Sequence, residues 1–231
     1  MKSLKCLTNE KDIILDIYNY QIDSSKNNFK FMTFTKEQIE TTVKNKGYKW
    51  FEDDENKGYD VNIVGVRNST TGKSVTNVFD DLITVSYKVD GQWVINQWSI
   101  TTDPGTKAVK EYSNPNGVAR VVPGQYRGLW SIGLHKGQYE ALRQVKPVKV
   151  YRDKNKDMSF DETIIQEGVF GINCHRSNPT TESTYVENWS EGCQVFKRVK
   201  DFNQFMDIIR KSRDIHGNSF TYTLLESSDI Q

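Results

Sequence analysis

The chain has 231 residues, enough for one large domain or two small ones whose core needs no disulfides or metals. Its 31 basic and 30 acidic side chains nearly cancel, so the composition does not indicate a surface for nucleic acid. Residues 1–20 lack the apolar segment of a secretory signal, and no window is apolar enough for membrane insertion. Three cysteines at positions 6, 174 and 193 form an odd, sparse set that favours free thiols.

The first part of the chain carries two helix patterns. Residues 8–20 place isoleucines at helical spacing. Thr35 is followed three residues later by Gln38, which is the pattern of a capping box, and Gly47 stands where a helix C-terminus is expected. We therefore predict two helices, of which the second is the better marked.

An acidic, polar stretch at residues 51–60 follows, and its composition is typical of a loop. It is the best place in the sequence for a boundary. We predict an N-terminal helical portion at residues 1–58 and a β-rich domain at residues 59–231.

The β-rich part begins with a short apolar strand at residues 61–67. Two β-branched and aromatic runs, 82–89 and 93–100, are joined by Asp90-Gly91, which is a strong signal for a tight hairpin. Together with the helices, these strands predict an α+β fold with mixed, mainly antiparallel sheets. Further strands are expected at 119–134, 147–152 and 220–225, with a helical turn at 137–144 and a helix from Asp201 to Gly217 whose apolar stripe packs in the core.

Residues 170–175, FGINCH, alternate apolar and polar side chains as a strand does. The alternation directs Cys174 into the core and His175 toward a site. Cys193 lies in the segment Ser-Glu-Gly-Cys, where glycine allows close backbone approach, so Cys193 and His175 form a possible nucleophile and base. The alternative is a zinc site on the two cysteines and the histidine, but adjacent strand residues point to opposite faces and no fourth ligand is evident. No metal or cofactor is therefore expected.

The spacing of these residues resembles a known family. His175, fourteen intervening residues, and then Ser190-Glu-Gly192-Cys193 are similar to the signature of the L,D-transpeptidase (YkuD-like) catalytic domain. Several other segments are similar to those of an uncharacterised phage and bacterial subgroup of that family. In chain order they are TTDPG, VPGQY, GLHKG, PVKVYRD, GINCHR and NWSEGCQVF. The resemblance spans roughly residues 60 to 200.

The resemblance implies a β-rich catalytic domain that acts on the stem peptides of peptidoglycan. Cys193 would attack a peptide carbonyl, His175 would accept the thiol proton, and the N–H groups of Gly192 and Cys193 would form the oxyanion hole. Ser190, Arg176 and Glu191 would contact the substrate, with Arg176 either binding a carboxylate or remaining a solvated surface charge. An amine acceptor gives transpeptidation, and water gives hydrolysis.

Two positions depart from the family's pattern. Glu191 stands where the family has a histidine, and Gln194 stands where an arginine or asparagine is usual. A carboxylate beside the thiol raises the thiol pKa and repels an acidic stem. These departures therefore favour hydrolysis, or another reaction on the stem peptide, over transpeptidation.

Two other functional classes stay open. One is a non-catalytic cell-wall-binding or virion structural module that keeps the fold, and the other is a cysteine hydrolase acting on a different amide. With no secretory signal expected, a bacterial cytoplasmic chain would need help to reach the wall. We therefore expect a phage-encoded lysin held in the host cytoplasm before release, or a virion component, acting at the cell wall. Nothing in the sequence indicates an oligomeric state.

Outside the Cys/His segment, Asp153, Asn155 and Asp157 have the spacing that begins a calcium loop. Met158 replaces the glycine and Ile164 replaces the glutamate that such a loop requires. We predict a polar turn.

Overall fold

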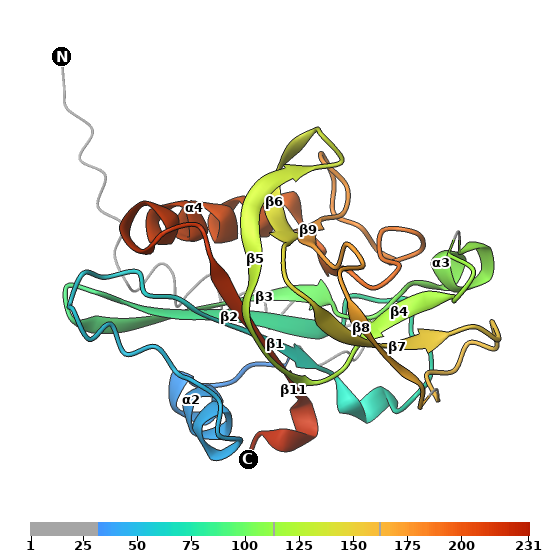
Figure 1. The fold of residues 1–231 in the computed structure, drawn as a ribbon, viewed down its shortest axis with the longest axis horizontal. Helices are drawn as coiled ribbons and strands as arrows, with labels where there is room; N and C mark the ends of the chain where they lie inside the picture. Colours follow the sequence, from blue (N-terminus) through green and yellow to red (C-terminus); the bar gives the residue numbers. More distant parts are fainter. Residues whose placement is uncertain (1–31, 113, 162) are drawn as a thin grey trace, which may run out of the picture. The chain divides into compact units, whose positions relative to one another are not determined.

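The computed structural model describes residues 32–112, 114–161 and 163–231 (Figure 1). Eight strands form a closed barrel that is mostly antiparallel, with parallel pairs β1–β11 and β9–β10. Around the barrel the strands are β1 (Asn62–Arg67), β11 (Phe220–Glu226), β5 (Gly124–His135), β6 (Tyr139–Gln144), β9 (Cys174–Arg176), β10 (Gln194–Phe196), β3 (Gln92–Thr101) and β2 (Asp81–Val89). The prediction of an α+β fold with mixed, mainly antiparallel sheets is confirmed.

A second, three-stranded antiparallel sheet contains β4 (Val118–Val121), β7 (Val148–Asp153) and β8 (Ile165–Gly168), in the order β4-β7-β8. The strand segment predicted at 119–134, punctuated by Pro and Gly, is divided at residues 122–123 between this sheet and β5 of the barrel. Ala119 on β4 donates its N–H to the carbonyl of Glu191, at 2.9 Å. This bond attaches the small sheet to the segment that leads into β10.

The longest helix, α4 (Val199–His216), packs its apolar stripe into the main hydrophobic core, as expected. Phe205 of the stripe lies edge-on to Trp98 of β3. The helix begins at Val199 and not at Asp201, whose carboxylate instead accepts a hydrogen bond from Arg198 Nε at 2.8 Å. It ends at Gly217, as predicted.

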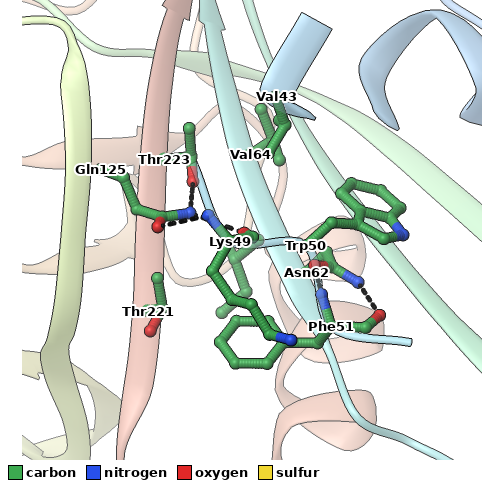
Figure 2. A pocket seen from close by; sticks show the side chains of 10 residues that line it. Val43, Lys49, Trp50, Phe51, Asn62, Val64, Gln125, Thr221 and Thr223 are labelled. Carbon is green, nitrogen blue, oxygen red and sulfur yellow. Dashed lines mark hydrogen bonds between the residues drawn. The ribbon is translucent and has the colours of Figure 1, made fainter. Parts of the chain in front are cut away.

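Helix α2 (Lys36–Asn45) has the predicted capping box. Thr35 Oγ1 accepts from the Gln38 N–H, and Gln38 Oε1 accepts from the Thr35 N–H. The buried face of α2 packs in one cluster with side chains of β1, β2 and β11. Figure 2 shows how the chain after α2 is attached, since the amides of Asn62 and Gln125 each exchange two hydrogen bonds with its backbone.

The predicted helix at residues 8–20 lies outside the described residues, and the proposed boundary after residue 58 stays a prediction. The remaining short helices are α3 (Thr106–Glu111), η1 (Ser69–Thr71) and η2 (Ser227–Asp229).

The hairpins β2–β3 and β5–β6 are both closed by residues with positive φ. The turn between β2 and β3 is made by Asp90 and Gly91 with φ of 50° and 76°, which confirms the predicted hairpin. The helical turn expected at 137–144 is wrong, because this segment is strand β6, paired with β5. Lys136 and Gly137, with φ of 50° and 71°, lie in the three-residue turn that joins β5 to β6.

No helix among the described residues is long and apolar enough to cross a membrane.

The loop after β7, considered above for calcium, is held by hydrogen bonds from its backbone to its own side chains. Asn155 Oδ1 accepts the Asp157 N–H, and Asp157 Oδ1 accepts the Ser159 N–H. These side-chain oxygens bind the loop's own backbone.

Candidate active site

The parallel pairing of β9 and β10 brings Cys193 and His175 to one place. His175 lies on β9, and Cys193 directly precedes β10, with Gln194 in register with Cys174. Both residues line a cleft of about 440 Å³. The other lining residues are Asn114, Gly117, Ala119, His135, Lys136, Arg143, Arg152, Phe170, Gly171, Ile172, Asn173, Asn188, Trp189 and Glu191.

Only part of the predicted strand 170–175 is regular. Strand β9 starts at Cys174, and Gly171 has a φ of 80° that interrupts the extended backbone before it. Cys174 is fully buried in the core, whereas His175 faces the cleft, so the two neighbours point apart as expected.

The Cys193 thiol is protonated at rest. Its Sγ donates to the carbonyl of Gly171 and accepts from the N–H of Asn173, both at 3.4 Å. Burial raises the pKa of the thiol to about 11, and the nearby carboxylate of Glu191 adds to the rise. The Asn173 N–H and the charge of Lys136 oppose it only in part. A neutral thiol at pH 7 needs a base to become a nucleophile.

His175 can supply that base. Its Nδ1 lies 2.8 Å from the carbonyl oxygen of Arg176. Because a carbonyl only accepts, Nδ1 carries the proton and Nε2 keeps its lone pair. The side chain is 5% exposed, and burial, followed by the neighbouring ring of His135, lowers the pKa of His175 to about 3. The backbone carbonyl of Arg176 thus orients the imidazole in the form that accepts a proton.

A second imidazole, His135 of β5, stacks on His175 with ring centroids 4.2 Å apart. Asn173 joins it to the site: Oδ1 of this amide accepts the Gln144 N–H at 2.9 Å, so its Nδ2 donates to His135 Nδ1 at 3.3 Å. His135 therefore carries its proton on Nε2, the opposite tautomer to His175. From the sequence, His135 in GLHKGQY is expected to be a structural or surface histidine, with a place in this cleft as the alternative if the strands pair suitably. The structure has the alternative.

The turn before Cys193 is built on glycine. Gly192 has a φ of 138°, and a Cβ there would collide with the carbonyl oxygen of Ala119. Ser190 is fully buried, and its Oγ accepts the Gly192 N–H at 3.1 Å and donates to the Cys193 carbonyl at 2.9 Å. Across residues 32–112, 114–161 and 163–231, the Cys193 N–H has no acceptor.

The structure brings together some of the predicted site residues and not others. Cys193, His175 and Glu191 line the cleft. Ser190 does not, since its hydroxyl is used within the turn. The guanidinium of Arg176 lies over the ring of Tyr139, 4.0 Å from its centroid, and is not part of the lining.

The predicted oxyanion donors also differ. The Gly192 N–H is bound to Ser190 Oγ, whereas the Cys193 N–H is available. Gln194, the other departure from the family pattern, is buried and accepts a hydrogen bond from Tyr222 at 2.6 Å, so it serves the barrel core.

Positive charge outweighs negative charge in the cleft, where Lys136, Arg143 and Arg152 stand against Glu191. In the described part of the chain, no group of three or more His, Cys, Asp or Glu is placed to hold a metal ion. The cleft lining contains a thiol, an oriented imidazole and three cationic side chains.

Comparison with protein-family models, with curated proteins and with solved structures found no match for this chain.

Proposed function

We propose that this protein is a cysteine-dependent enzyme with an L,D-transpeptidase-like (YkuD-like) catalytic domain, acting as a hydrolase or transferase on peptidoglycan stem peptides. One observation carries the proposal: the parallel pairing of β9 with β10 brings Cys193 and His175 into the lining of the same cleft, and the bond from Nδ1 of His175 to the Arg176 carbonyl leaves Nε2 unprotonated. The stem peptide as substrate rests on the resemblance of the His-to-Cys segment.

The proposed reaction has two stages, formation of a thioester on Cys193 and its breakdown, and His175 moves a proton in both. The Cys193 proton passes to His175 Nε2 as the sulfur attacks the substrate carbonyl, and the Cys193 N–H stabilises the resulting oxyanion. The C–N bond then breaks, the leaving amine takes the proton from His175, and a thioester remains. Water or an acceptor amine attacks the thioester, with His175 again taking the proton, and the thiol is released.

The pKa values determine when the proton moves. Burial raises the pKa of the Cys193 thiol to about 11 and lowers the pKa of His175 to about 3, so both groups are neutral at rest. Proton transfer must accompany attack on the bound carbonyl. The Gly192 N–H becomes a second oxyanion donor if it exchanges its bond to Ser190 Oγ for one to the substrate.

The test is mass spectrometry of purified muropeptides after incubation with wild type, Cys193→Ala and His175→Gln. Wild type should yield a product of defined mass that distinguishes hydrolysis from exchange, and both variants should lose it. Cys174→Ala, which removes a buried core thiol, is the matched control and should retain turnover if it folds. No product across a range of stem peptides would contradict the proposal.

A second candidate is a non-catalytic cell-wall-binding or virion structural module. It is favoured by the high thiol pKa and by the thiol donating to Gly171 O, since no hydrogen bond joins Sγ to an imidazole among the described residues. Turnover discriminates the two. Cys193→Ala leaves wall binding, measured by cosedimentation, intact in either case, and only an enzyme has turnover to lose. Digestion of an unrelated peptide library tests the remaining class, a cysteine hydrolase of other amides.

We also infer a phage-encoded lysin or a virion component acting at the cell wall as the setting of this activity. The inference depends on the subgroup resemblance. Lysis of walls by the purified protein added from outside, compared with Cys193→Ala, tests it.

A further inference from the structure

Arg152 of β7 is a buried cation that lines the cleft. Its side chain is 8% exposed. Nε donates to Gln166 Oε1 and Nη1 donates to the carbonyl of Gly117, each at 3.1 Å, while the guanidinium lies 4.6 Å from the ring centroid of Phe170. These contacts hold the group in one position but leave Nη2 and one Nη1 hydrogen without an acceptor in the described part of the chain.

The charge of Arg152 is also uncompensated. Within residues 32–112, 114–161 and 163–231, no carboxylate pairs with it, and burial alone lowers its pKa. Arg67, the other buried arginine, is by contrast paired with Asp103 at 2.9 Å and Glu226 at 3.5 Å. A buried charge without a counter-ion is costly, so a position that keeps one is expected to receive an anion from outside.

The register of the small sheet locates Arg152 relative to the nucleophile. Arg152 is paired with Ala119, and Ala119 in turn binds the Glu191 carbonyl and packs against Gly192. Two strand spacings therefore separate the Arg152 backbone from the turn that holds Cys193, a distance on the order of 10 Å. A peptide whose carbonyl lies at Cys193 can reach the guanidinium within one to three residues, at about 3.5 Å per residue.

We propose that Arg152 is a carboxylate-binding subsite that selects substrates with a free carboxylate near the bond to be cleaved. The planar guanidinium offers Nη1 and Nη2 to the two carboxylate oxygens, a geometry that lysine cannot match. Lys136 and Arg143 also line the cleft, so its lining carries three cationic side chains and the one carboxylate of Glu191. That the ligand of this subsite is a stem peptide rests on the proposed function.

The kinetic test uses the stem tetrapeptide L-alanyl-γ-D-glutamyl-L-lysyl-D-alanine and two analogues, one amidated at the D-glutamyl α-carboxyl and one at the C-terminus. Wild type should prefer the unmodified peptide to one of the analogues by at least tenfold in kcat/KM, mainly through KM. Arg152→Met should reduce this ratio to near one, and Arg152→Lys should restore it only in part. Arg127→Met, which removes an arginine stacked on Phe51 outside the cleft lining, should keep the wild-type ratio.

If Arg152→Met lowers kcat/KM by the same factor for all three peptides, then Arg152 only supports the fold and the proposal is overturned. A wild-type enzyme without preference would overturn it as well.

A binding measurement separates this proposal from the proposed function. Titration calorimetry of the Cys193→Ala protein with the same three peptides needs no turnover. Cys193→Ala should bind the peptide with both carboxylates free more tightly than one of the amidated analogues. If this preference disappears in the Cys193→Ala, Arg152→Met double variant, the subsite is supported even when wild type cleaves none of the peptides. Equal binding of the three peptides, or no binding, overturns the subsite whether or not wild type is an enzyme.

Discussion

Acid should destabilise this protein through the buried pair of histidines. The pKa of His175 is about 3 in the folded protein, against 6.5 for an ordinary histidine. Between these values the unfolded chain binds a proton that the folded chain does not, so the free energy of unfolding decreases as the pH falls. From pH 7 to pH 4 the loss attributable to His175 is about 3 kcal/mol. The pKa of His135 is also lowered by burial, and it acts in the same direction.

The assay is urea unfolding at a series of pH values, followed by tryptophan fluorescence. The free energy of unfolding of His175→Gln should fall less steeply with acid than that of wild type, with a difference of about 3 kcal/mol accumulated between pH 7 and pH 4. Glutamine keeps an N–H donor for the Arg176 carbonyl, so the variant should fold. Parallel curves for His175→Gln and wild type would refute the assigned burial of a neutral imidazole.

Three further predictions concern the site turn, the thiol and the buried charges. Alkylation of Cys193 by iodoacetamide, followed by intact mass, should be slow at pH 7 and accelerate toward pH 11. Glu191→Gln should shift this pH profile of the alkylation rate to lower pH, and a rate that does not change with pH would contradict the raised thiol pKa. Gly192→Ala should destabilise the protein by about 1–3 kcal/mol or more and abolish turnover, because its Cβ meets the β4 backbone, whereas Gly171→Ala adds strain without a collision; equal thermal shifts would be inconsistent with this geometry. Arg67→Met should lower the free energy of unfolding by about 3 kcal/mol, because it removes a partner of Glu226 and one of the two arginine partners of Asp103, the other being Arg120; a neutral effect in urea unfolding would disprove the pairing.

Features that depend on neighbours in the sequence were predictable. The capping box of α2, the Asp90-Gly91 hairpin and the apolar stripe of α4 each depend on residues within a few positions of one another. Strand β6 was misread because its residues do not alternate cleanly. Its antiparallel pairing with β5 overrides the local preference of GQYEALRQ.

The candidate site was predictable only in part, for the same reason. Cys193 and His175 were identified by their residue types and spacing. His135 was only an alternative, a structural or surface histidine that could line the cleft if the strands paired suitably, and Arg152 was not identified, because β5 and β7 reach the cleft through pairings that span many residues. Ser190 was expected at the substrate and is instead directed into the turn by two internal hydrogen bonds.

The sequence by itself determined which side chains can act as nucleophile and base, since thiol and imidazole chemistry belong to the residues. The tertiary structure decided their protonation and surroundings. A carbonyl one residue along the chain sets the tautomer of His175, burial raises the pKa of Cys193, and the register of β7 with β4 brings an uncompensated arginine to the cleft. Protonation and charge recognition depend on solvent exclusion and on groups brought together across strands, and neither is written in local sequence.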